Sequence, residues 1–533
     1  MQTVSEKWKQ AHKQTLLNES FVEVSLNIGD PDALASVSSM DNGATYFSNT
    51  AQVVSEVDKN VAPYCTLEQN LWLLDGNRKA IPESDFGSNG FVGVELSDDA
   101  RVFSGKTPLI TLNFPRVFYN LIPGITITWS PTYGEYADTF IVTVYNGDSV
   151  VASKEVVGNR STKSLVMLDI AGYDRIEIMI LRWCLPYRRA RVEDIFVGIS
   201  RVYTKSELFN YIHSQSVDPI STSLPKAEIQ FSLNNVDGEY NPYNKQGMSK
   251  YLISRQEVKT RYGLKLADGA VEWVPGGTFY LSSWDAKQNG LTADFTARDL
   301  LEFMSATCVD ICNLGPRSLY NLANYVLSEA MLPLNDDGSV KWVIDESLKS
   351  IYTTAPLPMD TLANCLQLIA NASKCVLYQD RSGTLHIEPL RVDVTDYKID
   401  SFNSYSKSEI TLGKPIKRVV MKTYSYTNGE KGIEGTSTDV EVECGENGEK
   451  ITVDNPLITD SSWATEVGRW IGTHLSHRMT LSSSWRPDVN LDALDIVKND
   501  SKYNTSDVLM TDVKFTYNGA FRASGEGRVI SDG

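Results

Sequence analysis

Several residue types and motifs on which catalytic proteins depend are scarce or missing in this chain of 533 residues. It has only 5 histidines, and it contains no GxSxG, no HExxH, no P-loop and no complete GxGxxG motif. Acidic pairs such as Asp98-Asp99 and Glu193-Asp194 are common, but none stands out from surface charge as a glycosidase dyad. The sequence therefore predicts no enzyme, no catalytic residue and no cofactor.

Long apolar runs are also absent. No stretch approaches the roughly 20 apolar residues that a membrane-spanning helix needs. Residues 1–20 are polar and helical in pattern, and they do not resemble a signal peptide. We therefore expect a protein without a membrane span that is made in the cytoplasm and stays soluble.

The 7 cysteines do not form the pattern of a disulfide framework or of a metal site. Their number is odd and they are scattered, which is typical of reduced, buried thiols. Cys308 and Cys312 have a spacing that a metal accepts, but no histidine or second cysteine pair accompanies them. His474 and His477 are expected to be one packed and one exposed side chain rather than ligands. We predict no metal site.

Positive charge is in short supply as well. Lys and Arg number 50 against 67 Asp and Glu, so the net charge is -17 and the pI is about 4.9. Proteins that bind nucleic acid place clusters of Lys and Arg side chains against the phosphates. We therefore expect no specific nucleic-acid binding. Two interpretations of the acidity stay open. It is either a solvated surface that aids solubility, or the wall of a ring whose lumen repels DNA and lets it slide.

Strand patterns are abundant. The 25 tyrosines and 10 tryptophans, together with many Val, Ile and Thr residues, favour a mainly β (α+β) fold. Residues 21–28 alternate apolar and polar side chains, as a half-buried strand does. Between residues 41 and 200, short alternating strands separated by turns predict a jelly-roll β-sandwich. Barrel-like strands resume only after residue 220, so we interpret 41–200 as a sandwich inserted into a barrel that strand 21–28 begins.

Residues 300–390 have the strongest helical pattern. Apolar spacing predicts one helix over 319–327 and another over 362–369, with Asp360 as the N-cap of the second. Asp380-Arg-Ser-Gly383 predicts the turn of a hairpin. This segment is therefore predicted to be a small α/β domain.

The stretch Leu224–Gly263 carries a more specific pattern. An alternating strand runs into Asn-Asn-Val-Asp-Gly238, the Asn241-Pro242 turn follows, and a second strand ends at Tyr262-Gly263. This order of strand, NxDG, YNP and QxVxxxYG resembles the signature of β-barrel proteins in the tail tips and baseplates of tailed bacteriophages. The resemblance covers roughly residues 20–30 and 200–530.

The resemblance to these tail hub proteins implies two tail-tube-like β-barrels, a small α/β domain and the inserted jelly-roll sandwich. The domains expected on this basis are an N-terminal helix and first barrel strand (1–40), an inserted sandwich similar to carbohydrate-binding modules (41–200), a first hub barrel (201–305), the α/β domain (306–400) and a second hub barrel (401–533).

The same resemblance implies a structural virion protein made in a host bacterium. Its expected role is that of a baseplate or tail-tip hub, which closes the tail tube and links it to the tip or receptor-binding apparatus, in host attachment and DNA ejection. The implied partners are further copies of the chain, as a trimer, the tail tube or distal tail protein, and a tip, spike or tape-measure protein. Minimal hubs lack the insertion at 41–200, so a peripheral upper-baseplate role stays open.

Aromatic side chains in the predicted sandwich suggest an alternative function. Jelly rolls host many carbohydrate-binding modules, although a shared fold is weak support for a shared function. Tyr133, Tyr136 and Trp183 are the candidates to stack on a sugar, whereas Trp129 alternates with apolar residues and is expected in the core. The alternative is a host cell-wall glycan-binding adhesin or a wall-degrading tail protein. A wall-degrading protein needs a catalytic domain with a recognisable dyad or nucleophile, and the sequence shows none.

Overall fold

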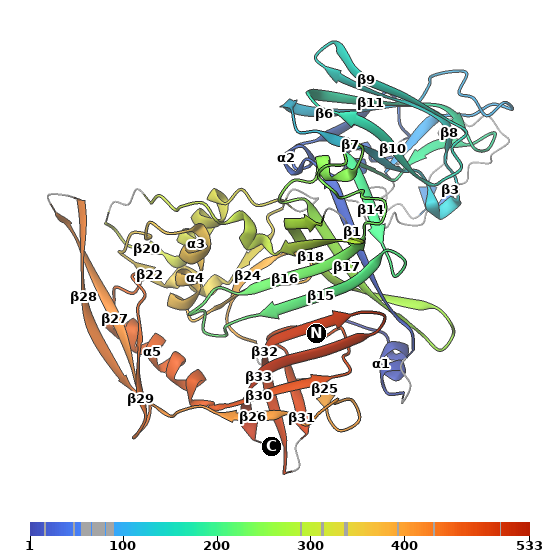
Figure 1. Ribbon diagram of the computed structural model, residues 1–533. Helices are drawn as coiled ribbons and strands as arrows, with labels where there is room; N and C mark the ends of the chain where they lie inside the picture. The colour runs from blue at the N-terminus through green and yellow to red at the C-terminus, as the bar shows by residue number, and fades with distance from the viewer. Residues whose placement is uncertain are drawn as a thin grey trace.

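The computed structural model describes residues 1–14, 18–45, 48–54, 65–66, 80–81, 90–287, 290–310, 314–334, 339–391, 394–429, 432–500 and 503–532. Strands dominate it, which confirms the predicted mainly β fold class. Figure 1 shows a central sheet, a sandwich at the upper right, and a part with helices at the left. In the described part of the chain, no helix is long and apolar enough to cross a membrane.

One hydrogen-bonded path of strands runs through the 13-stranded central sheet. Its first half has the spatial order β14 (Gly198–Tyr203), β1 (Ser20–Gly29), β17 (Glu257–Lys265), β18 (Val271–Ala286), β19 (Thr292–Arg298), β16 (Lys226–Asn234) and β15 (Leu208–Ser216). The second half continues from β15 with β32 (Thr505–Tyr517), β33 (Phe521–Asp532), β30 (Met479–Trp485) and β26 (Glu409–Leu412), and β32 also pairs with β31 (Ile496–Asp500), which pairs with β25 (Val394–Ile399).

The two halves of the central sheet are joined edge to edge. Tyr211 on β15 lies opposite Tyr517 on β32 in an antiparallel ladder. The two regions that the sequence predicts as separate barrels therefore share one continuous set of hydrogen bonds between strands.

Alternation along the strands builds the core of this sheet. On β1, Val22, Val24 and Leu26 are buried, because successive side chains of a strand point to opposite faces. The buried side chains of both halves form one hydrophobic cluster, which also contains Trp8 of α1 (Glu6–His12). The indole Nε1 of Trp8 donates a hydrogen bond to Asp488 Oδ1 at 2.8 Å. The N-terminal helix is thus fastened to the second half of the sheet.

The inserted part is a sandwich with its own hydrophobic cluster. One sheet has the order β2 (Ser38–Asp41), β6 (Leu109–Phe118), β11 (Tyr173–Trp183), β8 (Ala137–Asn146) and β9 (Ser149–Val157), and the other has the order β10 (Lys163–Ile170), β7 (Ile122–Thr128) and β13 (Asp194–Phe196). The remaining elements are α2 (Pro31–Leu34), η1 (Thr50–Val54), η3 (Pro131–Tyr133) and the strand pairs of β3 (Cys65–Thr66) with β4 (Ala80–Ile81) and of β5 (Phe91–Leu96) with β12 (Arg189–Val192).

The two places where the chain passes between the central sheet and the sandwich lie side by side. Gly29 at the end of β1 pairs with Gly198 at the start of β14. A Cβ on Gly198 would lie 2.4 Å from the carbonyl oxygen of Ile28, and the φ of 148° at Gly198 also favours glycine. Lys250 Nζ forms an ion pair with Asp169 of the sandwich at 3.0 Å. The insertion is therefore attached by two adjacent strands and by side-chain contacts.

The helical part also contains residues that the sequence assigns elsewhere. Residues 416–476 share a hydrophobic cluster with the predicted α/β domain, through side chains such as Met421 and Ile471, although the sequence assigns everything from residue 401 to the second barrel. The reason is that alternation marks a strand as half-buried but does not reveal which core it joins. The segment comprises β27 (Ile416–Gly429), β28 (Gly432–Glu443), β29 (Glu449–Val453) and α5 (Ser461–Ser476).

The predicted helices are found as α3 (Leu319–Glu329) and α4 (Leu362–Ala372). Thr361, not Asp360, is the N-cap of α4, because the Thr361 side chain accepts a hydrogen bond from Asn364 N. The shorter elements around them are β20 (Arg317–Ser318), β21 (Trp342–Ile344), β22 (Tyr352–Thr353), β23 (Val376–Gln379), β24 (Leu385–Glu388), η5 (Leu300–Phe303) and η6 (Glu346–Ser350). The remaining short helix, η4 (Met248–Tyr251), lies between β16 and β17 and packs into the core of the central sheet.

Candidate functional site: a polar junction and an open sheet face

Arg381 is the centre of a buried polar junction between three parts of the chain. It lies in the turn between β23 and β24, and only 4% of it is exposed. Its Nε donates to Asp492 Oδ1 at 2.6 Å, its Nη1 to the carbonyl oxygen of Pro275 at 2.8 Å, and its Nη2 to that of Leu491 at 2.8 Å. One guanidinium group therefore joins the α/β part to both halves of the central sheet.

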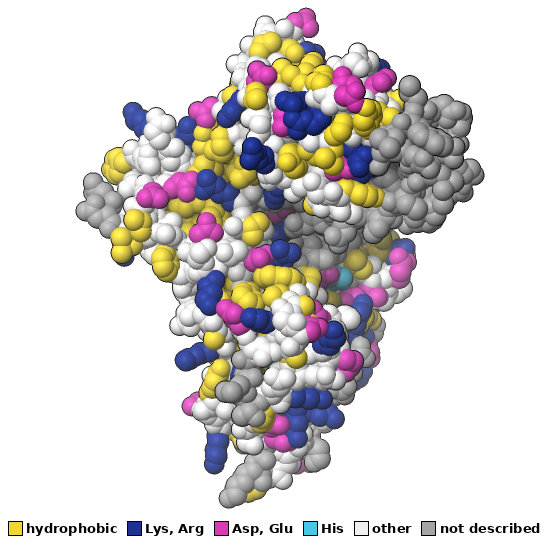
Figure 2. Space-filling model, turned by 90° about the vertical axis from the view of Figure 1, so that its right-hand side faces the viewer, with side chains coloured by type: hydrophobic (Ala, Val, Ile, Leu, Met, Phe, Trp, Pro, Cys, Tyr) yellow, Lys and Arg dark blue, Asp and Glu magenta, His cyan; other side chains and the backbone are white. Residues whose placement is uncertain are grey.

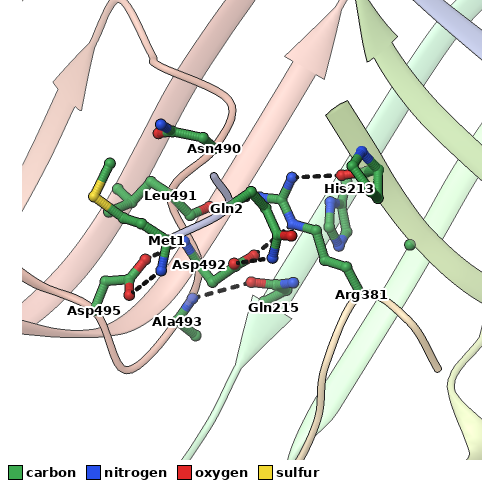
Figure 3. A network of polar contacts seen from close by, with 12 residues as sticks. Met1, Gln2, His213, Gln215, Arg381, Asn490, Leu491, Asp492, Ala493 and Asp495 are labelled. Atoms are coloured by element: carbon green, nitrogen blue, oxygen red, sulfur yellow. Dashed lines mark hydrogen bonds and ion pairs between the residues drawn. The ribbon is translucent and has the colours of Figure 1, made fainter. Parts of the chain in front are cut away.

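Asp492 is the acceptor at the middle of this junction. Figure 3 shows Gln2 and Arg381 converging on it, and Gln2 Nε2 donates to its Oδ2 at 2.9 Å. Burial opposes ionisation of Asp492, but the charge of Arg381 and the hydrogen bond from Gln2 outweigh that effect and keep the pKa of Asp492 below its usual value. The pair is therefore ionised, and the extreme N-terminus is held at the same point, because the amino group of Met1 lies 2.5 Å from Asp495 Oδ1.

A neutral histidine adjoins the junction. His213 on β15 is fully buried, and burial together with the nearby charge of Arg381 lowers its pKa to about 3. The hydroxyl of Tyr262 lies 2.8 Å from His213 Nδ1 and also 2.8 Å from the hydroxyl of Tyr211. These groups form a fixed polar network beneath the ion pair, and none of them is exposed to react with a substrate.

A cavity of about 420 Å³ opens beside the junction, lined by residues of the first half of the sheet, the β23–β24 hairpin and the loop before β31. One of its lining residues is Asp299, the N-cap of η5, whose Oδ2 accepts a hydrogen bond from Ala227 N at 2.8 Å. Burial raises the pKa of Asp299 to about 7. Among the described residues, no group of three or more His, Cys, Asp and Glu side chains could hold a metal ion, and Cys312 lies outside the described residues.

A second feature is the side of the central sheet that faces away from the core, which we call the open polar face. It crosses six neighbouring strands, and its side chains are mainly small hydroxyl and amide groups with nearly balanced charges. Many of them are exposed, while their neighbours along each strand, such as Phe231 and Phe515, are buried. The open polar face consists of Asp294, Thr296 and Arg298 on β19, Glu228, Gln230 and Ser232 on β16, Asn210, Ile212 and Ser214 on β15, Asp512, Lys514 and Thr516 on β32, Arg522, Ser524 and Glu526 on β33, and Ser482 and Ser484 on β30.

Charged side chains elsewhere on the surface are also mixed in sign. Figure 2 shows Lys and Arg interspersed with Asp and Glu over the side of the molecule that it presents. The net charge of -17 is therefore not gathered into one acidic patch on that side.

The three aromatic residues proposed for sugar binding differ in accessibility. Tyr133 on η3 is 41% exposed, and the guanidinium of Arg191 lies 4.3 Å from the centre of its ring. Tyr136 is half-buried. Trp183 corrects the expectation from the sequence: it is 0% exposed, its Nε1 donates to Glu135 Oε2 at 3.0 Å, and its ring packs edge-on against Trp129. Trp183 is a core residue that has no free ring face for a sugar.

Sequence reasoning missed Arg381 and Asp492. It predicted the turn at residues 380–383 correctly, but an arginine in a turn is ordinarily exposed. Arg381 is buried only because Asp492, 111 residues away in the chain, and Pro275 pack against it. No local pattern carries that information.

Comparison with known proteins gives matches among solved structures alone. No protein-family profile matches the chain, and no curated protein does. A tail protein from Neisseria meningitidis MC58 matches with a TM-score of 0.42 and 10% identity over 62% of this chain and 94% of that one. The prophage MuSo2 tail protein from Shewanella oneidensis has a TM-score of 0.40 and 12% identity, over 61% of this chain and 94% of its own. The prophage tail protein gp18 from Listeria monocytogenes EGD-e has a TM-score of 0.39 and 10% identity, over 63% and 93%.

All three are described as tail proteins, two of them from prophages, and tail proteins are the class that the pattern at Leu224–Gly263 resembles. At TM-scores this low we draw nothing about function from them.

Proposed function

We propose that the protein is a structural component of a bacteriophage tail, a baseplate or tail-tip hub that closes the tail tube and links it to the tip or receptor-binding apparatus. In this role it forms a ring, a trimer, in which the two halves of the central sheet act as the tube-like barrels. Its neighbours are the tail tube or distal tail protein on one side and a tip, spike or tape-measure protein on the other.

The observation that carries this proposal is the open polar face. Nucleic acid binds proteins chiefly through Lys and Arg that neutralise its phosphates, so a wall of hydroxyl and amide groups with balanced charge gives DNA little to hold. The open polar face has this composition and continues across both halves of the sheet without a break in strand pairing. A subunit with such a face turned inward can line a channel through which DNA slides.

The Arg381 junction supports the same role. A ring that holds pressure and transmits force needs subunits whose parts do not shift relative to one another. Buried charges that are paired and hydrogen-bonded favour a single arrangement, because a shift leaves them unpaired. Arg381 and Asp492 join three parts of the chain in this way.

The first test is the mass and shape of the purified protein, measured by mass photometry and negative-stain imaging. A closed ring with a central hole is the expected result. A strict monomer that binds purified cell-wall polysaccharide would contradict the hub function and support the adhesin function instead.

A labelling experiment tests which face lines the channel. Ser524→Cys places a thiol on the open polar face, and Val157→Cys, on the exposed β9 of the sandwich, is the matched control. A bulky polyethylene-glycol maleimide should label both variants in the dissociated protein. In the assembled ring it should label Val157→Cys at the same rate and Ser524→Cys much more slowly. Equal rates in the ring would show that the open polar face points outward.

Glycan binding by the sandwich is the second candidate function, and the exposure of Tyr133 favours it. An aromatic ring presented on a loop can stack on a sugar face. The test is binding of purified host-wall polysaccharide by the full chain and by Tyr133→Ala, with Tyr119→Ala as the control, since Tyr119 is an exposed tyrosine elsewhere on the sandwich. Loss of binding in Tyr133→Ala alone supports the function, and equal binding by both variants contradicts it.

A further inference from the structure

The hairpin of β27 and β28 projects away from the body of the protein, at the left of Figure 1. Its strands pair without a register shift from Arg418 opposite Glu443 to Gly429 opposite Gly432. At its base, α5 covers one side so closely that a Cβ on Gly472 would lie 2.3 Å from the sulfur of Cys444 in the loop after β28. The base of the hairpin is therefore held firmly against the α/β part.

The outer half of this hairpin has no such cover. Residues 433–439 of β28 are all exposed, although the side chains of a strand alternate between two faces. The ring of Tyr426 lies over Gly435 and stacks near Tyr424, and these contacts support the ribbon from one side. A two-stranded ribbon on its own is marginally stable in water, and a third strand is what normally stabilises it.

The outer edge of β28 is free to accept that strand. In the part of the chain that the structure describes, β28 pairs with β27 alone. Cys444 N donates to the carbonyl oxygen of Lys417 at 2.9 Å, and hydrogen-bonded pairs alternate with other pairs along an antiparallel ladder. The even-numbered residues of β28 therefore bond to β27. The N–H and C=O groups of odd-numbered residues, such as Ser437 and Asp439, point to the open edge.

Several of the usual protections of an edge strand are missing from β28, which has no proline, no lysine and no bulge. Its charged residues are all acidic. Glu441 and Glu443, near the base, are paired with Arg418. Glu434 and Asp439 form no ion pair among the described residues, although Lys422, whose ion pair is with Asp454, lies opposite Asp439 and attracts it. Like charges on facing strands are destabilising and opposite charges are stabilising. The edge therefore disfavours a second copy of β28 and favours a strand with basic side chains.

We propose that the free edge of β28 binds one extended, Lys- or Arg-bearing segment of another protein by strand addition. The main chain of β28 supplies the ladder of hydrogen bonds, and Glu434 and Asp439 select the basic side chains. The inference rests on the proposed function only in that the other protein is then a neighbouring tail component.

The probe is a short synthetic peptide of lysine and valine with lysines on both faces of the strand, because Glu434 and Asp439 lie on opposite faces of β28. It carries a fluorescent label, and the readout is fluorescence anisotropy with the full chain. Saturable binding is expected, and it should weaken as the salt concentration rises, because the selecting carboxylates are exposed. The same peptide with glutamate in place of lysine should not bind. No binding of the lysine peptide by the wild type overturns the proposal.

Ser437 provides the sharper test. Ser437→Pro removes one N–H from the open edge and leaves the bonds between β27 and the even-numbered residues in place. Its affinity for the lysine peptide should fall about fivefold or more, which corresponds to one lost hydrogen bond. The matched control Ser437→Ala keeps the N–H and should bind as the wild type does. Equal binding by the two variants refutes strand addition, and circular dichroism checks that both are folded.

The carboxylates are tested separately. The double variant of Glu434→Gln and Asp439→Asn should bind the lysine peptide more weakly and with a flatter salt dependence. Ring mass, measured on Ser437→Pro, separates this proposal from the hub, because β28 lies outside the central sheet and its edge is not needed for the ring. In the wild-type protein, a ring without peptide binding refutes strand addition alone, and peptide binding without a ring refutes the hub alone.

Discussion

A buried guanidinium needs a partner for its charge, and Arg381 finds that partner in Asp492. Removing one member of a buried pair leaves the other uncompensated, which typically costs about 3–5 kcal/mol. We predict that Arg381→Met lowers the thermal midpoint of unfolding, measured by scanning calorimetry. The double variant of Arg381→Met and Asp492→Leu, which removes both charges, should recover a large part of the loss. Equal midpoints for the single and double variants would show that Asp492 is not the residue left unpaired.

Asp299 makes the stability of the protein depend on pH. Burial raises its pKa from an ordinary 3.8 to about 7. Between those values the folded protein holds a proton that the unfolded chain releases, so the contribution of Asp299 to stability falls as the pH rises. We predict that Asp299→Asn, which cannot ionise, has a flatter dependence of thermal midpoint on pH between about 4 and 7. Parallel pH profiles for wild type and variant would contradict this assignment.

At the scale of elements, the contact of α5 with the loop after β28 reverses the usual effect of a glycine-to-alanine substitution on the stability of a helix. Inside a helix, alanine is normally more stable than glycine by about 1 kcal/mol. At position 472 a Cβ would lie 2.3 Å from Cys444 Sγ, so we predict that Gly472→Ala lowers the urea midpoint of unfolding. In a Cys444→Ala background, where the sulfur is gone, Gly472→Ala should instead raise the midpoint. The same sign in both backgrounds would contradict the close approach.

The elements themselves follow from local patterns. The helices α3 and α4 were predicted from apolar spacing, and the turn at 380–383 from its residue types, because both signals are carried by neighbours in the chain. Side-chain exposure was harder to predict. Trp183 and Tyr133 are both aromatic residues of the sandwich. Trp183 is the last residue of a strand that packs into the core, whereas Tyr133 lies on a surface turn.

At the scale of the whole molecule, the sandwich and the central sheet have separate hydrophobic clusters. Because Gly29 pairs directly with Gly198, the chain can be closed there without the insertion. We predict that replacing residues 30–197 by an Asn-Gly turn leaves a folded, ring-forming protein of smaller mass, measured by circular dichroism and mass photometry. Such a two-residue turn suits adjacent antiparallel strands. An insoluble or strictly monomeric product would show that the sandwich stabilises the rest of the chain.

The sequence by itself determined that this protein is mainly β and where the helices α3 and α4 lie, because these properties depend on composition and on periodicities within a few residues. Only the tertiary structure decided that β15 pairs with β32, that residues 416–476 join the helical part, and that Arg381 is buried against Asp492. Each of these depends on the free energy of packing segments that lie far apart in the chain. Alternation shows that a surface will be buried, and the partner that buries it is chosen by the fold as a whole.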